Sequence, residues 1–364
     1  MQDLEDCIVF LLYEHYQQNA GDVHEEGFLY DLVEEARLLL RCQFEETIEE
    51  SVYVDCLVLF SLMYPCRTSF YAPPQTDFET VLSELRQQPK HEQRSPEWYE
   101  RRNGMITASS GYKMFGSPCQ QNGLIVEKCQ AEKPRLPLSL YDARHWGVRY
   151  EPVSVQYYAH LNATVVEEFG CIAHRTYPFL GASPDGINVL EGSPAYGRML
   201  EIKNPVSREI TGSPTKEYFI QMQLQMEVCA INACDFLETK FVEYASKEAF
   251  DADGSFECSA DGKPKGKLML FLNQGKHEYA YPPYAASESE VDVWEAVQLE
   301  VPDREFMQHF FWKLEEVSCV IVERNRMWFE NHIHEMETFW ETICREKLTD
   351  EWRKRLPAVK KPVF

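Results

Sequence analysis

The chain has 364 residues, of which 44% are hydrophobic, and it carries a net charge of −23. This length suits one large domain or two of ordinary size. The longest apolar run, residues 52–64, contains Asp55 and is too short to cross a bilayer. The acidic start of the chain lacks the basic region of a secretory leader. We therefore expect a soluble intracellular protein and exclude a membrane protein.

The twelve cysteines include no Cys-x-x-Cys pair, which argues against a structural zinc site or a disulfide scaffold. The acidic charge also argues against a protein that coats nucleic acid through a broad basic face. The charge is uneven, however. Residues 1–90 contain 18 acids and 5 bases, whereas residues 99–149 contain eight bases and four acids. An acidic enzyme with a small basic channel is compatible with this distribution.

The first 90 residues predict an acidic helical subdomain, because apolar residues recur there at helical spacing. Its acidic face is either solvated or a docking surface for a partner. Residues 65–94 are expected to be a connector with one short helix, Phe78–Arg86. We place the domain boundary near residue 90. The second domain would then be residues 91–364, with its motifs between about residues 95 and 245.

A helix is expected to begin after Ser95, which is a good N-cap and is followed by proline, and to end at Gly104. A second helix should begin near Thr107. Thr107 and Ser109, together with free backbone N–H groups at this helix start, would make an anion site. The alternative is that they only cap the helix. Residues 117–145 contain three prolines and are expected to form a loop-rich insertion.

A helix over residues 145–161 carries Glu151, and Pro152 directly after it suggests that the helix starts near Tyr150. A later helix is expected over residues 217–230. The aromatic-rich stretch 303–343 is predicted to be helical and packed in the core, with base stacking as the alternative. Short strands are expected at residues 164–169, 171–177, 179–182, 186–190, 199–203, 235–244 and 267–272.

The central pattern combines two carboxylates and a lysine. Asp185 follows Ser-Pro in a turn, and Glu201 and Lys203 share one face of the next strand because strand side chains alternate. Oxygen ligands without Cys or His suit Mg²⁺ or Mn²⁺, which can activate a water for attack on a phosphodiester. The alternative is a solvated Glu–Lys ion pair.

Five blocks in order give the sequence a resemblance to the PD-(D/E)XK nucleases, within the phage lambda exonuclease and YqaJ-type viral recombinase group. The resemblance implies an α/β, restriction-endonuclease-like fold: a mixed central sheet flanked by helices, with an extra helical N-terminal subdomain and a helical C-terminal region. The blocks are Trp-Tyr-Glu-Arg-Arg-Asn-Gly-Met-Ile-Thr-Ala-Ser (98–109), Trp-Gly…Tyr-Glu (146–151), Ser-Pro-Asp-Gly (183–186), Leu-Glu-Ile-Lys-Asn-Pro (200–205) and Tyr-Phe-Ile-Gln-Met-Gln (218–223).

The resemblance also implies roles for individual residues. One or two Mg²⁺ or Mn²⁺ ions would be held by Asp185, Glu201, the Ile202 carbonyl and Glu151. Lys203 and Gln221 would position the attacking water. The terminal 5′-phosphate of a DNA end would be held by Arg102, Thr107, Ser109 and Ser183.

The function implied by the resemblance is Mg²⁺-dependent 5′→3′ exonuclease activity on linear duplex DNA, which leaves 3′ overhangs for recombination. Such an enzyme implies a single-strand annealing partner and a viral source, in the host nucleus or cytoplasm. Phage relatives form ring trimers. Two alternatives stay open: an endonuclease or RNA-degrading nuclease of the same fold, and a non-catalytic scaffold that binds DNA ends.

Overall fold

The computed structural model describes residues 77–91, 95–130, 139–140 and 142–356, together with a few isolated positions before residue 39. Each of those isolated positions is helical. The rest of the predicted N-terminal subdomain lies outside the described residues, and the boundary near residue 90 stays a prediction. None of the described helices is long and apolar enough to span a membrane.

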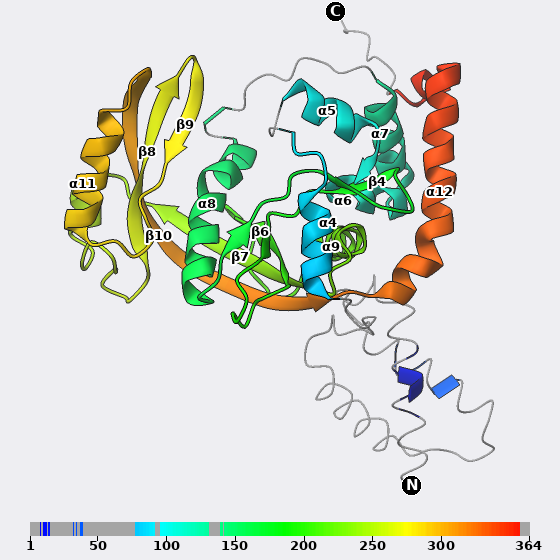
Figure 1. The fold of residues 1–364 in the computed structure, drawn as a ribbon, viewed down its shortest axis with the longest axis horizontal. Coiled ribbons are helices and arrows are strands. Elements are labelled where there is room, and N and C mark those ends of the chain that lie inside the picture. Colours follow the sequence, from blue (N-terminus) through cyan, green and yellow to red (C-terminus); the bar gives the residue numbers. More distant parts are fainter. Residues whose placement is uncertain are drawn as a thin grey trace, which may run out of the picture.

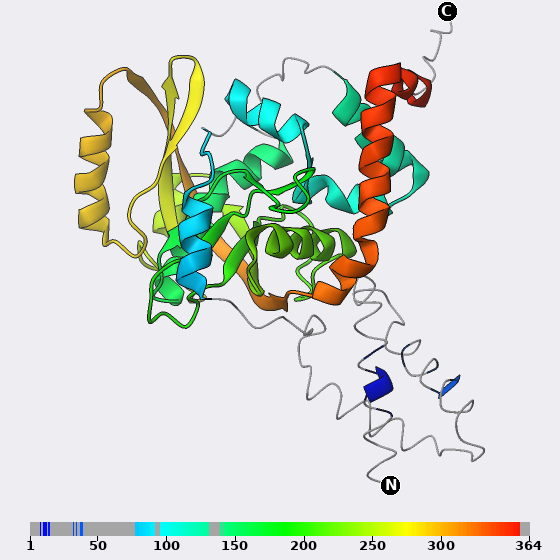
Figure 2. The same cartoon turned by 45° about the vertical axis from the view of Figure 1, so that its right-hand side comes forward.

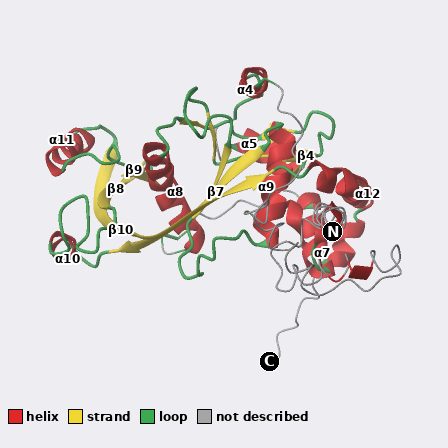
Figure 3. Cartoon of the chain, turned by 90° about the horizontal axis from the view of Figure 1, so that it is seen from below, coloured by secondary structure: helices red, strands yellow, loops and turns green. Residues whose placement is uncertain are grey.

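Two β-sheets form the centre of the described fold, and helices flank them (Figures 1 and 3). The larger sheet has the strand order β2-β5-β6-β7-β10-β8-β9, in which β6 and β7 are parallel and all other neighbours antiparallel. The predicted mixed α/β sheet is therefore confirmed. The strands are β2 (Val166–Glu167), β5 (Gly186–Asn188), β6 (Met199–Lys203), β7 (Ala233–Glu243), β8 (Lys265–Asn273), β9 (Lys276–Ala280) and β10 (Arg304–Glu323).

The smaller sheet positions two of the predicted site segments. Its order is β1-β4-β3, with β1 parallel to β4, so that Thr107 pairs with Gly181. Gly181 has no room for a Cβ atom, because Met105 and the Ile172 carbonyl occupy that space. The close approach brings residues 105–109 beside residues 180–183. The strands are β1 (Ile106–Thr107), β3 (Ile172–Ala173) and β4 (Leu180–Ala182).

Local capping chemistry explains several helices. Ser95 accepts a hydrogen bond from the Trp98 N–H, and Pro96 takes the first position of α5, as predicted. The short helix predicted at Phe78–Arg86 is α4, and its buried face packs on the core. The helices are α4 (Phe78–Arg86), α5 (Pro96–Asn103), α6 (Ala108–Gly111), α7 (Pro118–Cys129), α8 (Ala143–Leu161), α9 (Lys216–Cys229), α10 (Lys247–Asp251), α11 (Glu288–Leu299) and α12 (Arg326–Thr349), with 3-10 turns η2 (Tyr112–Phe115) and η3 (Glu351–Arg355).

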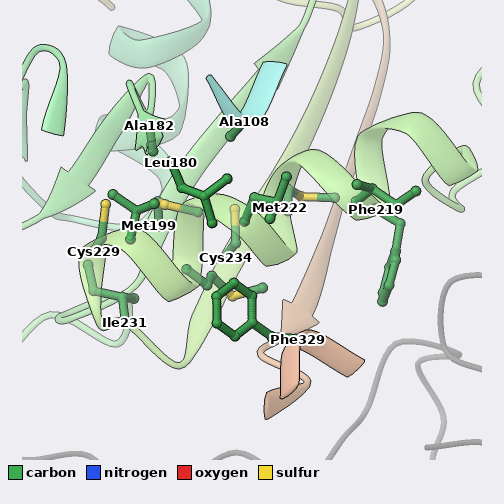
Figure 4. Close-up of a cluster of buried hydrophobic side chains, with 14 of the residues drawn as sticks. Ala108, Leu180, Ala182, Met199, Phe219, Met222, Cys229, Ile231, Cys234 and Phe329 are labelled. Atoms are coloured by element: carbon green, nitrogen blue, oxygen red, sulfur yellow. The ribbon is translucent and has the colours of Figure 1, made fainter. Parts of the chain in front are cut away.

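Helix α9 is the central helix of the core. Eleven of its 14 residues are buried, because it packs between α6, β4 and β7 on its different sides and against α12 at its end (Figures 2 and 4). The side chains around it are mostly Met, Leu, Phe and Cys, as Figure 4 shows for Leu180, Met199 and Phe329. A helix buried on all sides places even its polar residues inside the protein. The glutamines of α9 can therefore interact only with other groups inside the protein.

Two predictions about the helical segments were wrong in part. The insertion 117–145 contains α7, whose capping box of Ser117 and Gln120 the prolines had obscured. Helix α8 starts at Ala143 and continues through Pro152, although proline cannot donate to the helix ladder. Tyr150, Val153 and Tyr158 are buried on either side of Pro152, so tertiary packing holds the helix together across it.

The prediction that residues 303–343 are helical was wrong over its first half. Residues 304–323 form β10, a 20-residue strand that pairs with β7 along one edge and with β8 along the other. Its aromatic and β-branched residues have high strand propensity, and their spacing by chance resembled a helical one. In Figure 1, strand β10 runs from the left-hand layer of β8, β9 and α11 to the lower centre of the view, and so joins that layer to the rest of the fold. Strand β9 and helix α11 were not predicted.

Candidate active site

A carboxylate cluster lies where β5 and β6 pair. We use this name for Asp185, Glu201 and Lys203. Asp185 precedes β5, and its carboxylate accepts a hydrogen bond of 2.7 Å from the Ile202 N–H in β6. Glu201 and Lys203 lie on one face of β6 and form an ion pair, while Ile202 packs into the core on the other face. The structure therefore brings the three predicted residues together.

Two glutamines of α9 hold Glu201. Gln221 donates to one carboxylate oxygen at 2.5 Å and Gln225 donates to the other at 2.8 Å. Residues four apart share a helix face, which is why both amides reach the same side chain. Gln221 is buried and contacts Glu201 rather than Lys203. Sequence reasoning missed Gln225, although its spacing of four from Gln221 on a predicted helix was the available signal.

The electrostatics of the cluster favour a cation. Burial raises the pKa of Asp185 well above its usual range, and the nearby carboxylates of Glu201 and Glu151 raise it further. Burial alone would lower the pKa of Lys203, but Glu201 and Asp185 raise it, and the net direction is upward. One ammonium thus faces three carboxylates, an arrangement that a divalent cation would stabilise.

The chemistry of the donors fits a hard divalent cation, because the candidate ligands are all oxygens. Asp185, Glu201 and the Ile202 carbonyl are adjacent across β5 and β6. Glu151, on α8, borders the same cavity as Asp185. Among the residues that the structure describes, no group of three or more His, Cys, Asp or Glu side chains has an arrangement that could hold a metal ion. Glu201 is instead occupied by its lysine and its two amides.

An Arg102 cluster lies next to the carboxylates. We use this name for Arg102, Thr107, Ser109 and Ser183. The Arg102 guanidinium donates to Ser183 at 2.9 Å, and its other terminal nitrogen lies 3.4 and 3.5 Å from the hydroxyls of Thr107 and Ser109. All four predicted residues therefore converge, although they come from three different segments.

Two further residues support Arg102 and were not predicted. The guanidinium lies over the Trp98 ring, 4.4 Å from its centroid, a geometry typical of a cation–π contact. From α7, the Lys128 ammonium donates to the Arg102 carbonyl at 2.9 Å. Trp98 lies one helical turn before Arg102 and could have been read from the sequence. Lys128 could not, because only the packing of α7 brings it there.

One residue of each cluster, Ser183 and Asp185, lines a cavity of about 310 Å³. Ser183 belongs to the Arg102 cluster and Asp185 to the carboxylate cluster, so the Ser-Pro-Asp turn links them directly. The cavity walls include Trp98, Glu151, Ser183 and Asp185. A group bound by Arg102 and Ser183 would therefore lie close to Asp185, which follows Ser183 by two residues in the sequence. This cavity is large enough for part of a nucleotide.

Part of the chain matches a known protein family. Residues 97–232 match the model of the YqaJ-like viral recombinase domain. An uncharacterized protein of Acanthamoeba polyphaga mimivirus is 28% identical over 302 residues, which cover 72% of this chain and 54% of that protein. The chain thus spans about half the length of this relative.

Two solved structures were also compared. The alkaline exonuclease LHK-Exo from Laribacter hongkongensis aligns with a TM-score of 0.43 and 18% identity over 71% of this chain and 98% of its own. A phage-related exonuclease from Haemophilus somnus aligns with a TM-score of 0.36 and 13% identity, covering 66% and 96% of the two chains. The domain match spans all five blocks of the sequence resemblance. Residues 97–232 of the chain are therefore similar to the YqaJ-like viral recombinase domain, the group that the five sequence blocks resemble.

Proposed function

We propose that this protein is a metal-dependent nuclease that degrades linear duplex DNA from 5′-phosphorylated ends. The observation that carries the proposal is the Ser183–Asp185 turn. Ser183 accepts from Arg102, Asp185 belongs to the carboxylate cluster, and both residues line one cavity. The Arg102 cluster offers hydrogen-bond donors to an anion, and the carboxylate cluster offers oxygen ligands to a cation. A terminal phosphate and a scissile phosphodiester need these two environments side by side.

The Arg102 cluster would hold the terminal phosphate. A guanidinium with several N–H donors, hydroxyls within 3.5 Å of it, and the backbone at the start of a helix suit a dianion better than a neutral hydroxyl. The Trp98 ring packs against one face of the Arg102 guanidinium and would hold it in position. Binding the terminal phosphate here would set the position of the next phosphodiester in the strand.

The carboxylate cluster would carry out the hydrolysis. Asp185, Glu201 and the Ile202 carbonyl, with Glu151 across the cavity, would hold one or two Mg²⁺ or Mn²⁺ ions. Such an ion would polarise the phosphodiester and lower the pKa of a bound water. Lys203 would stabilise the negative charge that develops on the phosphate. Gln221 and Gln225 would fix the Glu201 carboxylate, and release of Glu201 from Lys203 would free an oxygen for the metal.

Cleavage from the 5′ end would leave a 3′ single strand for recombination, and a single-strand annealing protein would be the natural partner. A viral source and a ring trimer belong to the same proposal. The competing functions differ in what they bind or cut: an endonuclease needs no end, an RNA-degrading nuclease cuts RNA, and a scaffold binds ends without cleaving them.

One assay separates these functions. The protein is incubated with Mg²⁺ and four substrates: linear duplex with 5′-phosphate, the same duplex with 5′-hydroxyl, covalently closed circular duplex, and linear RNA. We expect the phosphorylated linear duplex to be degraded fastest and to release mononucleotides, while the circle survives. Asp185→Asn is the matched control and should be inactive on every substrate. Cutting of the circle, efficient loss of RNA, or end binding without cleavage would each reject the proposal in favour of one alternative.

A further inference from the structure

Lys128 is a buried cation outside the predicted machinery. It lies in the last turn of α7 and is 4% exposed, although α7 presents most of its other polar residues to solvent. Lysine is almost never fully buried unless its ammonium is matched, because desolvation of the charge is costly. The position therefore calls for a specific partner.

The partner is the backbone of α5. The Lys128 ammonium donates to the Arg102 carbonyl at 2.9 Å, and that carbonyl also accepts the Met105 N–H at 3.4 Å. The carbonyl lies at the C-terminal end of α5, where the helix leaves carbonyls without partners and where its dipole favours a cation. Lys128 thus ties α7 to the residue that carries the guanidinium of the Arg102 cluster.

The charges around Lys128 are mixed. Burial lowers the pKa of Lys128 to about 8, and the charges of Arg102 and Lys113 also lower it, while Glu127 and Cys171 act in the opposite direction. The positive charge on Lys128 is therefore costly to bury. An anion bound at the Arg102 cluster would stabilise that charge, since it would offset the repulsion between the two cations.

We propose that Lys128 is a positioning residue for the terminal-phosphate site. It holds the Arg102 backbone through the hydrogen bond to the Arg102 carbonyl and supplies a second positive charge near the site. This inference rests on the proposed function of the Arg102 cluster. It predicts that Lys128 acts on the choice of DNA end and on the affinity for that end. Its effect reaches the phosphate through Arg102.

The test compares Lys128→Met, which keeps the apolar stem but removes the charge and the donors, with Lys128→Arg, which keeps both. Lys113→Met is the matched control, because Lys113 is a partly exposed neighbour that pairs with Glu127. For each protein, kcat and KM are measured on linear duplex with 5′-phosphate and with 5′-hydroxyl. We expect Lys128→Met to lower the preference for 5′-phosphate roughly three- to tenfold, mainly through KM, since the net contribution of a typical hydrogen bond is on this scale. Lys128→Arg should recover most of the loss.

A pH series gives a second readout. The wild-type affinity for the phosphorylated end should fall as pH rises through about 8, where Lys128 loses its proton. In Lys128→Met this loss of affinity near pH 8 should be absent. Thermal unfolding checks the fold, and Met should not destabilise the protein because the buried ammonium is itself costly. Arg102→Met is measured in the same series. If it removes the preference while Lys128→Met matches Lys113→Met, the inference is wrong and the proposed function stands. If wild-type protein has no preference for phosphate, the proposed function itself fails.

Discussion

The carboxylate cluster and the Arg102 cluster border one cavity but are built in opposite ways. The Arg102 cluster is satisfied as it stands, since its guanidinium already has three hydroxyl neighbours and an aromatic ring. The carboxylate cluster is not, since burial and neighbouring carboxylates raise the pKa of Asp185 and leave negative charge in excess. The Arg102 cluster is therefore a preformed anion receptor, whereas the carboxylate cluster would be stabilised by a cation. Under the proposed function, the Arg102 cluster would choose the substrate and the carboxylate cluster would perform the reaction.

The largest effect should come from removing charge from the carboxylate cluster. We expect Asp185→Asn to lower the cleavage rate about a thousandfold or more on every DNA substrate, because a charged metal ligand is worth several kcal/mol in the transition state. A rate measurement at saturating Mg²⁺ checks this. Residual activity above one-tenth of wild type would remove Asp185 from the site.

The same substitution should stabilise the metal-free protein. The pKa of Asp185 is raised, so its charged form costs stability at neutral pH, and that cost disappears as pH falls through the raised pKa. In the presence of a chelator, Asp185→Asn should therefore raise the melting temperature by roughly 2–4 °C, the shift expected for about 1 kcal/mol in a domain of this size. Adding Mg²⁺ should raise the melting temperature of wild type but not of the variant. A lower melting temperature for the variant in chelator would contradict the comparison.

A smaller effect is expected at the amides that hold Glu201. Gln225→Leu keeps a similar volume but leaves one carboxylate oxygen of Glu201 without its donor, and we expect a rate loss of about tenfold through misplacement of that side chain. Gln223→Leu is a poor control because it breaks a different bond, to the backbone near α12. Glu217→Gln, at an exposed position in the first turn of α9, is the better one. If Gln225→Leu cleaves at the wild-type rate, the hydrogen bond from Gln225 to Glu201 has no role in catalysis.

The smallest effect should come from the aromatic support of the Arg102 cluster. Trp98→Leu removes the ring over the guanidinium while keeping an apolar side chain, and a cation–π contact contributes about 0.5–2 kcal/mol. We expect a two- to tenfold loss of preference for 5′-phosphate, on the scale of that contact, with cleavage of the 5′-hydroxyl end nearly constant. Competition between the two substrates in one tube measures this. An equal loss on both ends would assign Trp98 to the fold alone.

The sequence predicted the parts of both clusters that lie within short motifs. Asp185, Glu201 and Lys203 could be placed together because strand alternation and a hairpin connection determine their geometry. The Arg102 cluster required the family resemblance, since Arg102, Ser109 and Ser183 meet only through pairing of β1 with β4. The residue preferences of helix N-caps also predicted Ser95 as the N-cap of α5.

What the sequence could not predict depends on long-range packing. Strand β10 pairs with β7 and β8 on its two edges, and although its residues have strand propensity, nothing in residues 304–323 identifies these two partners. Pro152 is tolerated because buried neighbours hold α8 on either side of it. Lys128 reaches Arg102 only after α7 and α5 pack together. At Pro152 tertiary contacts override a local preference, and in the other two cases they select partners that lie far apart in the sequence.

The most direct test of the account measures whether end selection and chemistry separate between the two clusters. Initial rates are determined for wild type, Lys203→Met and Arg102→Met on linear duplex with 5′-phosphate and with 5′-hydroxyl, under one Mg²⁺ concentration. The account predicts that Lys203→Met slows both substrates by the same large factor, so that the phosphate preference is unchanged. It predicts that Arg102→Met removes the preference while slowing the 5′-hydroxyl substrate little. The account is contradicted if Lys203→Met changes the preference, or if Arg102→Met slows both substrates equally.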